Sequence, residues 1–125
     1  MIEITVPGIP PSVNHYKVPV RRGLKIAYKV TYQAQKFKRD IAIMLGGRFV
    51  DADAFEVEVL IYLGPRQKGD ADNFLKVIMD GLADAGAFRT AGERRTDYAV
   101  SDAISRRRND RMNPRTVIRV KAATL

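Results

Sequence analysis

Apolar and polar residues alternate in several separate stretches of the chain, a pattern that predicts β-strands with one buried face. The clearest stretch is 55–63, FEVEVLIYL, which is rich in β-branched and apolar residues. Residues 2–6 and 115–121 alternate in the same way, and 98–105 is a more modest candidate. A weaker strand or hairpin is expected over 24–29.

Two further stretches carry apolar residues at the spacing of an amphipathic helix. The first begins at Thr31 and ends before two consecutive glycines, 46–47. The second is expected from residue 72 or 73 to 85, and Gly86 follows its C-terminus. Its apolar face is expected to consist of Phe74, Leu75, Ile78, Met79 and Leu82. Gly81 lies inside this helix and disfavours it by about 1 kcal/mol relative to alanine.

The order of these elements is strand, strand, helix, strand, helix, strand, strand. It predicts a single α/β (α+β) domain over residues 1–125, with a mixed sheet of about four to five strands and both helices on one face. Residues 87–97 are expected to form a loop, and 109–114 a turn. The length of 125 residues fits one domain and not two independent cores.

The composition excludes several function classes. Apolar residues make up 46% of the chain, but no apolar run is long enough to span a membrane. The first residues also lack the basic and apolar regions of a signal peptide. Cysteine is absent, which excludes disulfides, thiol nucleophiles and cysteine-bound zinc. We therefore expect a cytoplasmic protein with no membrane partner.

The chain carries a strong positive charge. Lys and Arg number 22 against 14 Asp and Glu, which gives a formal net charge of +8. Such a surface attracts polyanions, and phosphate backbones are abundant polyanions in a cell. The basic residues gather at 17–29, at 36–39 and at 106–108. A generic solvated basic surface is the alternative, but the charge favours contact with nucleic acid.

Within this basic chain, carboxylates gather between the expected central strand and the second helix. Asp70 and Asp72 are one residue apart, and Asn73 follows. Carboxylates at a phosphate-binding surface repel the ligand unless a cation neutralises them, and Mg²⁺ prefers such oxygen ligands. The cluster therefore indicates a metal-dependent phosphodiester enzyme. Taken alone, Asp72 or Asn73 would also fit the N-cap of a helix.

Lys76 follows Asp72 by four residues, and Asp80 follows Lys76 by four, so all three lie on one helical face. One interpretation is a surface ladder of ion pairs. The other places the Lys76 ammonium beside the carboxylates, where it stabilises charge that develops on a phosphoryl group. In that arrangement, Asp80 supports Lys76 or a neighbouring loop and does not bind metal.

Two motifs together resemble one known family. Residues 69–88, GDADNFLKVIMDGLADAGAF, are similar to the central motif of the RusA-type Holliday junction resolvases, of the form D-x-D-N-x-x-K-x-x-x-D-x-L-x-x-x-G. Residues 10–14, PPSVN, resemble the PPSxN loop that follows the first strand in that family. Length, charge and element order agree as well, so the resemblance covers nearly the whole chain.

The resemblance implies a homodimeric, Mg²⁺-dependent crossover junction endodeoxyribonuclease, often encoded by phages or prophages. Its substrate would be the four-way DNA junction of recombination and repair. The resemblance also implies that Asp70 and Asp72 bind the metal and that Lys76 is required for cleavage. Mn²⁺ is expected to substitute for Mg²⁺, and no organic cofactor is expected.

The third acidic ligand is the point at which this chain departs from the family. The family has an Asp pair soon after the glycine that ends the helix, followed by a valine, whereas here the segment is longer and Thr96 replaces the first Asp. We expect Asp97 to be the third metal ligand and catalytic acid, with Glu93 and Asp102 as alternatives. The three carboxylates would hold Mg²⁺ for attack of water on a phosphodiester.

Contacts to the DNA backbone are expected from polar and basic residues near these motifs. The predicted nucleic-acid-binding residues are Asn14, Lys17, Arg21, Arg22, Lys25, Arg66, Lys68 and Asn73. Arg94, Arg95 and residues 106–108 are further candidates. Two alternatives to an enzyme are a non-catalytic basic DNA-binding module of the same fold with an incomplete metal site, and a basic assembly or RNA-associated protein in which the acidic cluster only caps a helix.

Overall fold

The computed structural model describes residues 1–11, 16–64, 74–95 and 100–123 of the chain. Its largest layer is a four-stranded sheet with the strand order β1-β9-β5-β8. These strands are β1 (Ile2–Pro7), β5 (Phe55–Leu63), β8 (Val100–Asn109) and β9 (Arg115–Ala122). β9 is antiparallel to both β1 and β5, whereas β8 is parallel to β5. The sheet is therefore mixed, as the sequence predicts.

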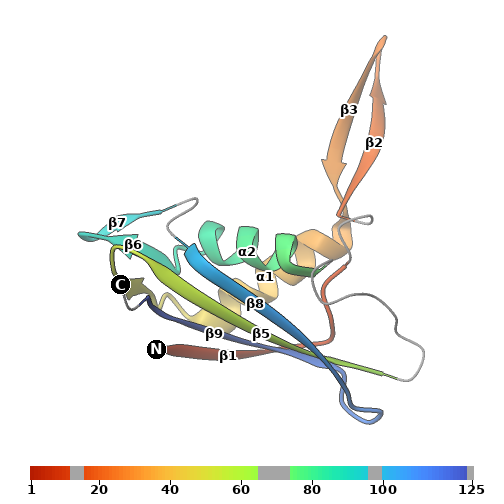
Figure 1. Cartoon of the computed structure of the whole chain (residues 1–125). Helices are drawn as coiled ribbons and strands as arrows, with labels where there is room; N and C mark the ends of the chain where they lie inside the picture. The colour runs from red at the N-terminus through yellow and green to blue at the C-terminus, as the bar shows by residue number, and fades with distance from the viewer. Residues whose placement is uncertain (12–15, 65–73, 96–99, 124–125) are drawn as a thin grey trace.

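Two helices, α1 (Tyr32–Leu45) and α2 (Leu75–Asp84), lie on the same face of this sheet (Figure 1). Along β5, buried residues alternate strictly with partly buried ones, and the buried set faces the helices. Phe55 and Ile61 from this strand pack in one core with Ile41 of α1 and Leu82 of α2. Burial of each such side chain contributes about 1.5–3 kcal/mol. The predicted placement of both helices on one face is confirmed.

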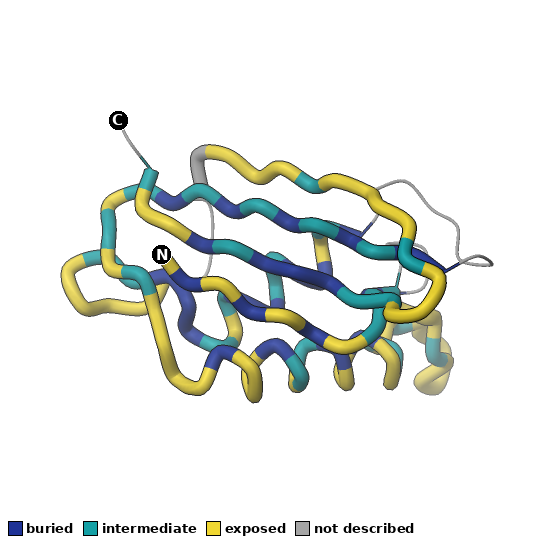
Figure 2. Tube along the Cα trace, turned by 90° about the horizontal axis from the view of Figure 1, so that it is seen from below, coloured by how far each residue is buried: buried dark blue, intermediate teal, exposed yellow. Residues whose placement is uncertain are grey.

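The opposite face of the sheet is charged. Arg119 on β9 lies between Glu58 of β5 and Glu3 of β1, and it donates to their carboxylates at 2.9 and 3.5 Å. Lys121 is paired in the same way with Glu56, at 3.1 Å. Figure 2 shows the resulting alternation of buried and more exposed residues along the strands. Because exposed pairs of this kind contribute only about 0.2–1 kcal/mol each, the apolar face dominates the stability of the sheet.

Hydrogen bonds at the helix ends explain where the helices begin and end. The Thr31 hydroxyl accepts a backbone N–H of the first turn of α1 at 3.3 Å, and Gly46 ends that helix in the left-handed conformation, with φ of 62°. After α2, Gly86 has φ of 77°, and the Gly86 and Ala87 N–H groups donate back to carbonyls of the last turn at 3.0 Å. Both predicted C-terminal ends are confirmed. The predicted start of the second helix, residue 72 or 73, lies outside the described residues.

Residues 87–97, which were expected to form a loop, contain two short strands. β6 (Phe88–Thr90) and β7 (Glu93–Arg94) form a hairpin, and β6 pairs in parallel with β4 (Val50–Asp51). Both turn residues, 91–92, have positive φ, of 52° and 82°, as in a type I′ turn. The expectation of a loop was wrong because such turns are recognised by Asn-Gly or Asp-Gly, and here alanine precedes the glycine.

A second hairpin consists of β2 (Lys17–Arg22) and β3 (Lys25–Val30). A strand or hairpin was expected only over 24–29, which β3 now largely covers, and β2 was not expected. Most residues of both strands are exposed, so the hairpin has no buried face that would impose an apolar alternation. β8 likewise continues through the arginines 106–108, beyond the expected end at residue 105.

The predicted turn at 109–114 is built around Asp110. One carboxylate oxygen of Asp110 accepts the N–H groups of Met112 and Asn113 at 3.1 and 3.3 Å, and the other accepts Arg115 at 2.7 Å. The hydrogen bond from the Arg115 guanidinium, together with these backbone donors, holds the pKa of Asp110 below its ordinary value. In the described part of the chain, neither helix is long and apolar enough to cross a membrane.

Candidate functional site

The β2–β3 hairpin, residues 17–30, carries five Lys or Arg residues and no acidic residue. We call it the basic hairpin. It projects away from the sheet and the helices (Figure 1). Its basic members are Lys17, Arg21, Arg22, Lys25 and Lys29, and all but Lys29 are predicted contacts of the DNA backbone. The fold therefore presents these predicted contacts together on one extended element.

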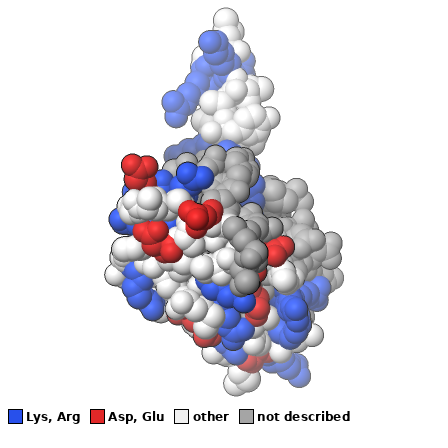
Figure 3. All heavy atoms as spheres, turned by 60° about the vertical axis from the view of Figure 1, so that its left-hand side comes forward, with Lys and Arg blue, Asp and Glu red and all other residues white. Residues whose placement is uncertain are grey.

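The strand register gives the basic hairpin two unlike faces, because directly opposed residues of a β-ladder share a face. Arg22 lies opposite Lys25, and Lys29 follows on the same face. On the other face, Pro19 lies opposite Tyr28, which is 72% exposed, and the basic residues Arg21 and Lys17 are on this face too. Figure 3 shows Lys and Arg side chains gathered along one side of the projecting hairpin, with uncharged side chains on the other. A polyanion would therefore meet three of the five basic residues on one face, whereas Lys17 and Arg21 lie on the other.

Tyr16 lies at the root of the basic hairpin, directly before the first residue of β2. The sequence analysis did not identify this residue. It is only 4% exposed. Its carbonyl accepts the N–H of Thr31 at 2.9 Å, and its phenol donates to Oδ2 of Asp80 on α2 at 2.6 Å. The only available signal was its place two residues after the 10–14 motif, because its partner Asp80 lies 64 residues away.

Two lysines lie beside the Tyr16 ring. Nζ of Lys17, from the hairpin, and Nζ of Lys76, from α2, are each 5.8 Å from the ring centroid. Lys76 also lies 3.5 Å from the Asp80 oxygen that accepts the phenol. The predicted spatial pairing of Lys76 with Asp80 is therefore present. The Lys76 side chain is 56% exposed, so its ammonium remains accessible to a phosphate.

Tyr16 keeps its proton in this setting. Burial of the phenol raises its pKa well above the ordinary value, and the hydrogen bond to Asp80 and the negative charges of Asp80 and Asp84 raise it further. Asp84 is itself paired with Lys38 of α1. At neutral pH the Tyr16 hydroxyl is therefore a donor, and Asp80 is an acceptor shared by Tyr16 and Lys76.

The predicted metal ligands Asp70, Asp72 and Asp97 lie outside the described residues. The same is true of Asn14, Arg66, Lys68 and Asn73, which are predicted to bind nucleic acid. Among the residues that are described, no group of three acidic or histidine side chains is placed to hold a metal ion. By donor chemistry, three aspartates suit Mg²⁺, which takes hard oxygen ligands. The metal site stays a prediction.

Both alternatives for the third acidic ligand lie in the described part of the chain, and neither is near the start of α2. Asp102 lines a depression on the outer face of the sheet together with Glu58 and Arg119, whereas α2 covers the inner face. Glu93 precedes Arg94, whose guanidinium packs against Gly86 beyond the C-terminal end of α2. Ten helical residues, about 15 Å, separate that end of α2 from its start.

Further basic residues proposed as DNA contacts occupy different surroundings. Arg94 donates to the carbonyl of Asp84 at 3.5 Å, at the C-terminal end of α2. This position favours a cation because of the helix dipole, so Arg94 has a structural role there. The arginines 106–108 lie on β8, which is an edge strand of the main sheet, and all three are exposed. They are separate from the basic hairpin in the chain and in the fold.

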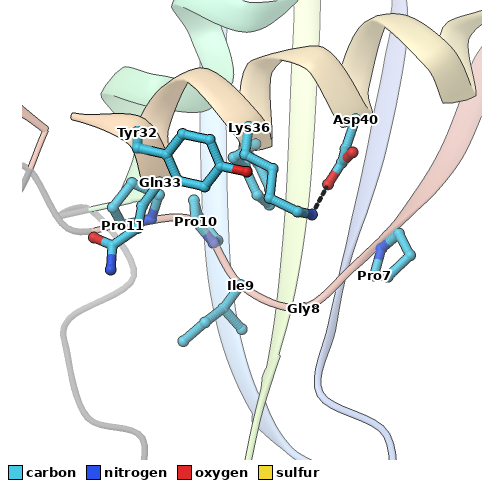
Figure 4. Close-up of a pocket in the computed structure, with 10 residues that line it drawn as sticks. Pro7, Gly8, Ile9, Pro10, Pro11, Tyr32, Gln33, Lys36 and Asp40 are labelled. Atoms are coloured by element: carbon cyan, nitrogen blue, oxygen red, sulfur yellow. Dashed lines mark hydrogen bonds and ion pairs between the residues drawn. The ribbon is translucent and has the colours of Figure 1, made fainter. Parts of the chain in front are cut away.

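A groove of about 560 Å³ runs between the segment after β1 and the first turns of α1. Figure 4 shows Pro10 and Pro11 gathered with Tyr32 and Gln33 at one end of it. Lys36 and Asp40 close it with an ion pair of 2.8 Å. The groove therefore contains the first part of the PPSVN motif, although the sequence analysis did not foresee a cavity there.

Comparison with known proteins does not identify a family for this chain. No family model matches it, and no curated protein matches it. The resemblance to junction resolvases therefore stays a prediction that is carried by residues 10–14 and 69–88.

Proposed function

We propose that this chain is a Mg²⁺-dependent endodeoxyribonuclease that resolves four-way DNA junctions by paired, symmetric cleavage. The observation that carries the proposal is the contact between the root of the basic hairpin and the charged face of α2. Through Tyr16 and Asp80, a surface that attracts phosphate is joined to Lys76, which belongs to the same motif as Asp70 and Asp72. One predicted binding residue, Lys17, and the predicted catalytic Lys76 thus lie at the same tyrosine ring, which supports the proposal.

The basic hairpin would bind the sugar-phosphate backbone without reading bases, because its lysine and arginine side chains attract phosphates and the phosphates are the same for every base sequence. Lys76 would donate a hydrogen bond to a phosphoryl oxygen as negative charge grows there. Its exposed ammonium and its single carboxylate partner, among the described residues, suit that role. Asp70, Asp72 and Asp97 would hold Mg²⁺, which when bound activates water and offsets charge on the phosphate.

We also propose that two copies act together in the cytoplasm. A four-way junction presents two symmetry-related strands for cleavage. A homodimer with two-fold symmetry presents two equivalent sites, so one complex can cut both strands. The charge of +8 supports the choice of a polyanionic substrate.

The test is cleavage of a synthetic four-way junction in the presence of Mg²⁺. Wild-type protein is expected to produce symmetric nicks. Asp70→Asn is expected to abolish cleavage and leave junction binding intact, because it removes a predicted metal ligand but no basic contact. Asp53→Asn is the matched control, since Asp53 is an exposed aspartate in the segment before β5. This control is expected to cleave like the wild type.

Three outcomes separate the candidate functions. Uncut junction at every concentration of Mg²⁺ or Mn²⁺, with the protein folded, would refute the nuclease. Tight, salt-dependent binding without cleavage would instead support a non-catalytic DNA-binding module. If Asp70→Asn and Asp72→Asn changed only the stability and neither binding nor cleavage, the acidic cluster would be a helix cap.

A further inference from the structure

Tyr16 connects the basic hairpin to α2 through both its backbone and its side chain. The Tyr16 carbonyl and the Thr31 N–H close the base of the hairpin at the start of α1, with a separation of 2.9 Å. The phenol reaches in the other direction, to Asp80 at 2.6 Å. Because the residue is almost wholly buried, both contacts hold it in one position. Tyr16 therefore fixes the relative positions of the groups that contact it.

The Asp80 carboxylate would be a poor anchor without this phenol. The distance of 3.5 Å from Asp80 Oδ2 to Lys76 Nζ exceeds the length of about 2.7–2.9 Å that is usual for a strong charged hydrogen bond. Exposed pairs four residues apart on a helix also restrain their side chains weakly. The short bond from a buried hydroxyl selects one orientation of the carboxylate, and Lys76 then has a fixed acceptor.

The Tyr16 ring also brings the two lysines together. Lys17 belongs to the hairpin and Lys76 to α2, yet both ammonium groups lie 5.8 Å from the centroid of the same ring. An ammonium at this distance from an aromatic face is attracted to it. One stretch of sugar-phosphate backbone can therefore contact a residue of the hairpin and the predicted catalytic lysine at once.

We propose that Tyr16 is a positioning residue: its hydroxyl fixes Asp80 and thereby Lys76, and its ring keeps Lys17 beside them, so that a DNA phosphate held by the hairpin lies next to Lys76. This inference rests on the proposed nuclease function, in which Lys76 acts on a phosphate. It adds a residue that neither the composition nor the two motifs single out.

Tyr16→Phe tests the proposal, since it removes only the hydroxyl and keeps the ring in its buried site. Tyr62→Phe is the matched control, because Tyr62 lies on β5 beneath Arg115, away from Lys76. Single-turnover cleavage of a four-way junction is expected to slow about tenfold to a hundredfold in Tyr16→Phe, as for other small displacements of a catalytic group. The control is expected to keep the wild-type rate. Junction affinity is expected to stay within about twofold, because no phosphate contact is removed.

The pathway through Asp80 is tested by a double variant. If the hydroxyl acts only through that carboxylate, Tyr16→Phe combined with Asp80→Asn is expected to be no slower than Asp80→Asn alone. Losses that multiply would overturn the proposal. Equal losses of rate and of junction affinity in Tyr16→Phe would also overturn it, because they would indicate a general loosening of the fold.

A measurement without cleavage separates this inference from the nuclease itself. The ¹³C relaxation of the Lys76 Cε group reports how tightly the side chain is held. Its order parameter is expected to fall in Tyr16→Phe toward that of the exposed Lys25, and to stay unchanged in Tyr62→Phe. An unchanged Lys76 in Tyr16→Phe would overturn the inference. If the wild type cleaves no junction, the nuclease proposal fails and this measurement still decides the role of Tyr16.

Discussion

Gly81 lies where α2 approaches α1 closely, and its replacement by alanine is expected to destabilise the protein. A Cβ atom at Gly81 would lie 2.8 Å from Cδ1 of Ile41 and 3.4 Å from Cγ of Lys38. Ile41 is fully buried, so its methyl group cannot turn toward solvent. Alanine favours a helix interior by about 1 kcal/mol, but overpacking a filled core costs about 1–3 kcal/mol. The expected net loss is about 1 kcal/mol, opposite in sign to the effect of helix propensity alone.

Urea unfolding followed by circular dichroism measures this change, with Ile41→Val as the companion variant. Ile41→Val removes the Cδ1 atom and alone costs about 0.5–1.5 kcal/mol. The double variant Gly81→Ala/Ile41→Val is expected to lose less than the sum of the two single losses, because the new methyl group occupies the vacated space. A gain of about 1 kcal/mol in Gly81→Ala would refute the reasoning, since helix propensity would then outweigh the contact.

Three further predictions concern binding, metal and pH. Lys25→Gln, near the tip of the basic hairpin, is expected to weaken junction binding and to lower the slope of log K against log salt concentration by about 0.9, the effect of one lost phosphate contact. Arg111→Gln, in the exposed turn before β9, should leave that slope unchanged, and equal slopes for both variants would contradict the assignment of the hairpin. Chelation of divalent ions by EDTA is expected to abolish cleavage but not binding, and Mn²⁺ should restore cleavage; cleavage in EDTA would count against the metal. Because the pKa of Tyr16 is raised in the fold, the unfolded chain loses this proton above pH ~10 while the folded chain keeps it. The contribution of Tyr16 to the free energy of unfolding should therefore be constant below pH ~10 and decrease as the pH rises beyond it, so the free energy should fall less steeply in Tyr16→Phe. Identical slopes in the two proteins would show that the pKa of the phenol is not perturbed.

Much of the fold could be predicted from local patterns. The strands that carry one buried face, such as β5, show the two-residue alternation that burial imposes. Thr31 and Gly86 mark helix ends because a hydroxyl and a left-handed backbone satisfy the unpaired groups there. The elements that were missed obey no such pattern: the first strand of the basic hairpin is exposed on both faces, and the turn at 91–92 uses an alanine.

The candidate site was predictable only in part. Lys76 and Asp80 could be paired from their spacing on one helix, and the structure has them in contact. Asp70, Asp72 and Asp97 lie outside the described residues, so their convergence stays a prediction. Tyr16 could not be predicted, because nothing in its neighbourhood along the chain indicates a contact with Asp80.

Local patterns were enough to predict the strands with one buried face, the C-terminal ends of both helices and the excess of positive charge, since these follow from neighbours along the chain. The packing of the folded chain is what brings the base of the basic hairpin beside α2 and the Tyr16 phenol to Asp80, 64 residues away. The physical reason is that such a contact depends on how the hairpin, α1 and α2 pack together. Packing depends on the combined shapes of distant side chains and not on the spacing of any one segment.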